Sequence, residues 1–102
     1  MTKKTKNFET LAKELLTKEQ IEKANFNAQI RYQMMTEVSA RVKKEMEINN
    51  IGFNELVKHM GTSPTQINKI LNGNANITFD SLAKICTVFD IEPHIVFKKS
   101  GT

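Results

Sequence analysis

The sequence predicts an all-α fold for this chain of 102 residues. All four glycines and both prolines lie after residue 51, and a first half without either helix breaker favours helix there. Apolar residues recur at helical spacing on both sides of this point, and only Ile95–Phe97 has the pattern of a strand. The length suits one small domain.

The first half is predicted to contain a long amphipathic helix that begins near Thr17 and ends near Asn49–Asn50. Thr17 and Gln20 have the spacing of a capping box, in which each side chain bonds to the other residue's backbone. The apolar stripe that follows consists of Ile21, Ala24, Ala28, Met35, Val38 and Val42. The poor helix formers in Asn25–Asn27 leave room for a break, and Phe8–Leu16 could form a short separate helix.

The second half is predicted to form short helices separated by brief turns. One helix covers Asn54–Met60 and stops at Gly61, because glycine tolerates the left-handed backbone found after helices. Ser63 and Pro64 are the residue types of an N-cap and a first helical position, and the helix that they begin ends before Gly73. Two helices that meet across a glycine turn are a helix-turn-helix candidate.

A further helix is predicted after Thr78, whose hydroxyl would cap it. Its expected buried face consists of Leu82, Ile85, Cys86 and Phe89. Pro93 then begins a final turn that contains Ile95–Phe97. We expect Cys86 to be a buried, unreactive thiol, and a single cysteine excludes a disulfide framework within the chain.

The helix after Gly61 is predicted to have one apolar and one polar side. Ile67, Ile70 and Leu71 form the inward stripe. Amides and hydroxyls on the other side can bind base edges in the major groove of DNA, and the two ends of the helix can hold phosphates. The predicted DNA-binding residues are Ser63, Pro64, Thr65, Gln66, Asn68, Lys69 and Asn72. The alternative is an ordinary helical hairpin in a protein-binding adaptor.

The stretch Phe53–Gly73, followed by Ile77–Ile85, resembles the Xre family, the Cro and lambda-repressor class of helix-turn-helix domains. The resemblance covers roughly residues 34–97 and implies a five-helix, lambda-repressor-like domain that dimerises on double-stranded operator DNA. It implies base contacts for Pro64, Thr65, Asn68 and Lys69, and phosphate contacts for Ser63 and Asn72. Many members carry a phosphate-binding glutamine where this chain has Phe53, which we expect in the core.

Residues 1–33 are predicted to be an N-terminal helical leader, and residues 98–102 a tail. Such a leader before an Xre domain resembles HigA-type antitoxins of type II toxin–antitoxin pairs. This resemblance implies a homodimer that neutralises a RelE/HigB-like mRNA-cleaving toxin and represses its own operon. The predicted partner-binding residues are Phe8, Leu11, Leu15, Leu16, Ile21, Ala24 and Ala28. The stripe could instead pack on its own domain or form a dimer, and the alternative function is a stand-alone Xre-family transcriptional repressor without a toxin.

The composition and the remaining motifs exclude other classes of protein. The net charge of +4 is compatible with nucleic-acid binding, yet residues 1–50 contribute +3 of it and the predicted DNA-binding half only +1. No catalytic constellation and no phosphate-binding glycine loop occurs, so we expect no enzyme activity, no cofactor and no small-molecule substrate. His59 and His94 lack ligand-spaced companions, which argues against a metal site. Short apolar runs exclude a membrane span and a secretory signal, so we expect a cytoplasmic protein.

Overall fold

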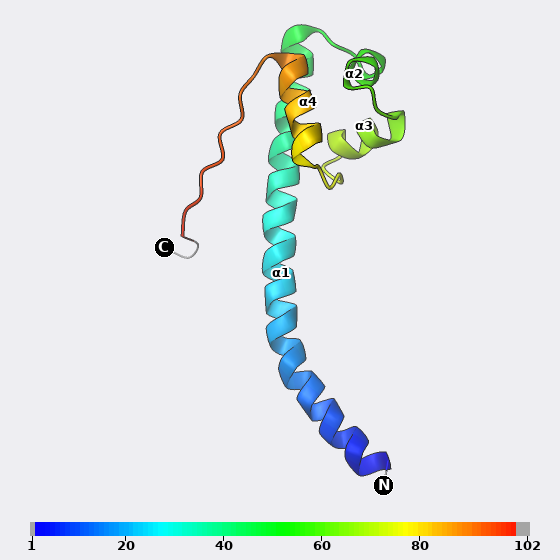
Figure 1. Ribbon diagram of the computed structural model, residues 1–102, viewed down its shortest axis with the longest axis vertical. Helices are drawn as coiled ribbons and strands as arrows, with labels where there is room; N and C mark the ends of the chain where they lie inside the picture. The colour runs from blue at the N-terminus through cyan, green and yellow to red at the C-terminus, as the bar shows by residue number, and fades with distance from the viewer. Residues whose placement is uncertain (1, 100–102) are drawn as a thin grey trace. The chain divides into compact units, whose positions relative to one another are not determined.

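The computed structural model describes the backbone of residues 2–99 and the side chains of residues 17–99. Four helices are present in this part of the chain: α1 (Thr2–Asn49), α2 (Phe53–Met60), α3 (Pro64–Leu71) and α4 (Phe79–Phe89) (Figure 1). Residues 2–99 contain no strand, so the all-α prediction is confirmed. The chain divides into two compact units, Met1–Met34 and Met35–Thr102, and the division falls inside α1.

Helix α1 is continuous, which corrects three details of the sequence prediction. Thr17 lies inside the helix and is therefore not an N-cap, Phe8–Leu16 is not a separate helix, and Asn25–Asn27 is not a break. Each asparagine lowers helix stability by less than about 1 kcal/mol, so strong helix formers on both sides extend the helix through it. The predicted end is confirmed, because Asn50 adopts a left-handed backbone with φ 54°.

The second unit has its own hydrophobic core, to which the C-terminal part of α1 and the three short helices contribute. Its most deeply buried large side chains are Val42, Leu56, Ile67 and Ile70, each at most 2% exposed. Helix α2 packs against both α3 and α4. Phe53 packs against this core, as expected from its place in the motif. The core fixes how α3 is held, and the outward side of α3 remains available for binding.

The C-terminal part of the second unit differs from the prediction. Four helices are found in the described residues where five were expected, because residues 91–99 form no helix. Ile95, Val96 and Phe97 are 59%, 80% and 90% exposed. Three consecutive apolar residues do not share one face of a helix, so helix formation would not bury them together. On α4, Ile85, Cys86 and Phe89 are buried as predicted, whereas Leu82 is only half-buried.

No helix within residues 2–99 is both long enough and apolar enough to cross a membrane.

Candidate nucleic-acid interface

Gly61 makes the turn between α2 and α3. Its backbone is left-handed, with φ 63° and ψ 33°, and its N–H donates to the carbonyl of Val57 at 3.0 Å. Glycine adopts this backbone conformation without strain, whereas a residue with a Cβ atom is strained in it. Only residues 61–63 separate the two helices, so α2 stops sharply and the chain changes direction into α3 (Figure 1).

Ser63 and Pro64 begin α3 as the sequence predicts. Ser63 is extended, with φ −78° and ψ 152°, and its Oγ accepts a hydrogen bond from the backbone N–H of Gln66 at 3.2 Å. Pro64 occupies the first turn, where its missing N–H costs nothing. The first turn contains no acidic residue, so the positive end of the helix dipole is left for an outside anion.

Helix α3 has the two sides that the sequence predicts. Ile67 and Ile70 are 0% and 2% exposed and face the core, and Leu71 is half-buried. Of the seven predicted DNA-binding residues, Gln66 is half-buried, and the exposed ones are Ser63, Pro64, Thr65, Asn68, Lys69 and Asn72. The structure therefore brings all seven together on one short helix and its two flanking residues. Their contact with DNA stays a prediction.

The C-terminal end of α3 is closed by backbone hydrogen bonds. Gly73 is left-handed, with φ 70°, and its N–H donates to Ile70 O at 3.1 Å. The N–H of Asn74 donates to Lys69 O at 2.8 Å. These two bonds form a Schellman motif. Lys69, the only charged residue of α3, therefore lies in a well-fixed last turn, with its side chain exposed.

Two helices joined by a tight glycine turn, with the second presenting a polar, acid-free side to solvent, define a helix-turn-helix domain. Residues 41–94 match the Cro/C1-type HTH DNA-binding domain. The match covers more than half of the 102 residues, and the chain belongs to this family of DNA-binding domains. The protein is thus a DNA-binding regulator. No curated protein and no solved structure matches the chain significantly.

The first unit presents exposed apolar side chains. Ile21, Ala24 and Ala28, three of the predicted partner-binding residues, are exposed. The side chains of the other four, Phe8, Leu11, Leu15 and Leu16, lie outside the described residues. These exposed residues stand close together in sequence, so they offer a candidate second binding surface.

This helix has a second apolar face, which the predicted partner-binding residues do not include. Phe26, Ile30 and Met34 are 50%, 38% and 56% exposed. Their spacing of four residues predicts a shared face, because at 3.6 residues per turn the three side chains lie within roughly 80° of one another around the helix. The stripe of Ile21 and Ala28 lies on the opposite side of the helix by the same arithmetic.

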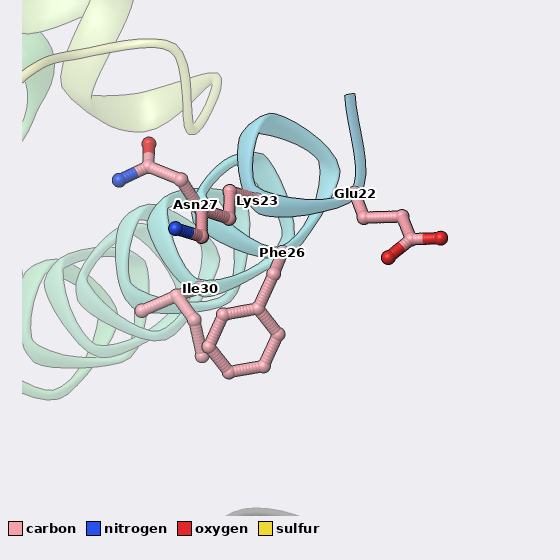
Figure 2. Close-up of a pocket in the computed structure, with 5 residues that line it drawn as sticks. All are labelled: Glu22, Lys23, Phe26, Asn27 and Ile30. Carbon is pink, nitrogen blue, oxygen red and sulfur yellow. The ribbon is translucent and has the colours of Figure 1, made fainter. Parts of the chain in front are cut away.

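The Phe26 ring lies beside the Ile30 side chain (Figure 2). The pair forms part of a shallow pocket, which is lined by Glu22, Lys23, Phe26, Asn27 and Ile30. The side chains of Glu22, Lys23 and Asn27 point away from the Phe26 ring (Figure 2). An apolar centre with a polar border is the usual composition of a protein-binding surface.

Proposed function

We propose that this DNA-binding regulator is the antitoxin of a type II toxin–antitoxin pair. It binds operator DNA as a homodimer through α3, represses its own operon, and neutralises a RelE/HigB-like mRNA-cleaving toxin through residues 1–33. One observation carries the partner half of this proposal. The second unit buries its own core, whereas in the first unit Phe26 is 50% exposed and Ile30 is 38% exposed.

A helix with exposed apolar residues on two sides gains little stability from its own chain. Isolated helices are marginal in water, and most helical stability in proteins comes from packing an apolar face. Fully burying a side chain such as Phe or Ile contributes about 1.5–3 kcal/mol. A partner groove that receives Phe26 and Ile30 supplies this missing burial, in the manner of other helix-in-groove complexes.

The DNA half of the proposal assigns roles along α3. Asn68 and Lys69, both exposed, contact base edges in the major groove. Ser63 and Asn72, at the two ends of the helix, contact phosphates. Two copies of α3 in a homodimer enter successive major grooves about 34 Å apart. Because α3 contains a single charge, the salt dependence of binding is expected to be shallow.

The partner half is tested by co-expressing the chain with each neighbouring reading frame. We expect one neighbour to arrest growth alone, and to be harmless and to co-purify when the chain is present. Phe26→Ala with Ile30→Ala should abolish co-purification and leave DNA binding intact, and Asn27→Ala is the matched control from the pocket border. A chain with no toxic neighbour and no co-purifying partner is the stand-alone repressor instead.

The DNA half is tested by gel shift with the DNA upstream of the chain's own gene. Lys69→Ala and Asn68→Ala should each weaken binding about 5- to 150-fold, the loss expected for one base contact. Lys84→Ala is the matched control, because it removes the same charge from an exposed site on α4. Unchanged binding by both α3 variants would refute the assignment of α3 as the DNA-contacting helix.

A further inference from the structure

We propose that Ser39, on α1, is a positioning residue that sets the orientation of α3 for base recognition. The proposal rests on the assignment of α3 as the base-contacting helix. Ser39 is 5% exposed, so its side chain is buried and does not belong to the exposed side of α3. Its Oγ donates a hydrogen bond of 2.7 Å to the backbone carbonyl of Leu71, the last residue of α3, across 32 positions of sequence.

The hydrogen bond completes the C-terminal end of α3. The last four carbonyls of a helix have no partner within it. Three of those in α3 are bonded by the following backbone, since Asn72 N–H donates to Asn68 O, Gly73 N–H to Ile70 O and Asn74 N–H to Lys69 O. The fourth, Leu71 O, is bonded by Ser39. The buried Ser39 hydroxyl of α1 therefore donates the hydrogen bond that no neighbouring backbone N–H donates to Leu71 O.

The chain directly after α3 runs close to α1, one turn away from Ser39. A Cβ built on Gly73 would lie 3.9 Å from both Cα and Oγ1 of Thr36, which is ordinary van der Waals contact. The hydrogen bond from Ser39 is directional, with a useful length range of only a few tenths of an ångström. It adds a directional contact between α1 and the last turn of α3 to the core packing of Ile67 and Ile70.

The placement of that turn matters for base contacts more than for phosphate contacts. Lys69 and Asn68 lie within one turn of Leu71, so a shift of the helix end moves both of them directly. Bidentate hydrogen bonds to base edges tolerate little displacement. Contact with phosphates is mainly electrostatic and is less sensitive to position. Losing the Ser39 bond should therefore reduce discrimination between DNA sequences and leave non-specific binding unchanged.

The experiment measures Kd for two duplexes at a temperature where every variant is fully folded. One duplex is selected from a random library by the wild-type chain, and the other is a scrambled duplex of the same composition. Ser39→Ala removes the donor, and Ser39→Cys keeps the volume and leaves only a weak donor. We expect both to bind the selected duplex about fivefold or more weakly, with unchanged affinity for the scrambled one.

Thr78→Ala is the matched control for loss of stability. It also removes a hydroxyl that holds a helix end, since Thr78 Oγ1 accepts from Ser81 N–H at 3.1 Å, but the helix is α4. We expect its preference for the selected duplex to equal that of wild type. Wild-type preference in Ser39→Ala and Ser39→Cys, or an equal loss in Thr78→Ala, overturns the positioning role.

Asn68→Ala and Lys69→Ala, measured on the same two duplexes, separate this inference from the proposed function. Where they lose preference and the Ser39 variants keep it, only the positioning role fails. Where they bind both duplexes like wild type, α3 is not the base-contacting helix and the proposed function fails.

Discussion

The turn between α2 and α3 allows a stability prediction whose magnitude comes from one backbone angle. Gly61 has φ 63°, and a Cβ built on it meets no atom within 4 Å. Gly61→Ala therefore adds no clash, and its main cost is the strain of a left-handed alanine, about 1–2 kcal/mol, which outweighs the smaller gain from a less flexible unfolded chain. For a domain of this size, each kcal/mol lowers Tm by about 4–8 °C.

Gly61→Asn is the graded comparison, because asparagine tolerates the left-handed region better than alanine. The chain already places Asn50 there, with φ 54°. We expect Gly61→Asn to lose less stability than Gly61→Ala. Both are measured by urea unfolding followed through the NMR signals of Ile67 and Ile70, so that melting of residues 1–34 does not enter. An alanine variant as stable as wild type, or an asparagine variant less stable than the alanine variant, would refute the argument.

Three further predictions concern other parts of the second unit. Gly52→Ser should stabilise the unit by about 0.5–1 kcal/mol in the same unfolding assay. Gly52 is the N-cap residue of α2, has φ −85°, provides no side-chain cap and has space for a Cβ. A less stable variant would contradict this prediction. Ile67→Ala should cost about 2–5 kcal/mol, because Ile67 is 0% exposed in the core, and a loss below 1 kcal/mol would be inconsistent with that burial. Cys86, 8% exposed, should react with a thiol reagent only as fast as the unit opens, and urea should accelerate the reaction; immediate reaction in the native protein would be contrary to its place in the core.

The features that were predictable from the sequence are those that depend on neighbouring residues. Gly61 determines the turn through its backbone preference. Ser63 determines the start of α3 through a hydrogen bond to Gln66, three positions further along the chain. The prediction was wrong where two local signals compete. Thr17 resembles an N-cap, yet the residues before it continue the helix, and a cap is needed only where a helix begins.

Two further differences from the prediction, at Phe26 and at Ile95–Phe97, have a common physical reason. Ile95–Phe97 was predicted to lie in a final turn, and Phe26 was not included among the predicted partner-binding residues. Whether an apolar residue is buried depends on which other surface reaches it, and this is a property of the folded chain. In the described residues, both stay largely exposed.

The sequence by itself determined the helical class, the helix-turn-helix motif and the residues on the outward side of α3. These features rest on periodicity, turn chemistry and caps, which act over a few residues. The tertiary structure alone decided that Ser39 bonds to the end of α3 and that Phe26 and Ile30 are exposed. A hydrogen bond across 32 positions exists only after the core has brought its two ends together, and no local pattern encodes that distance.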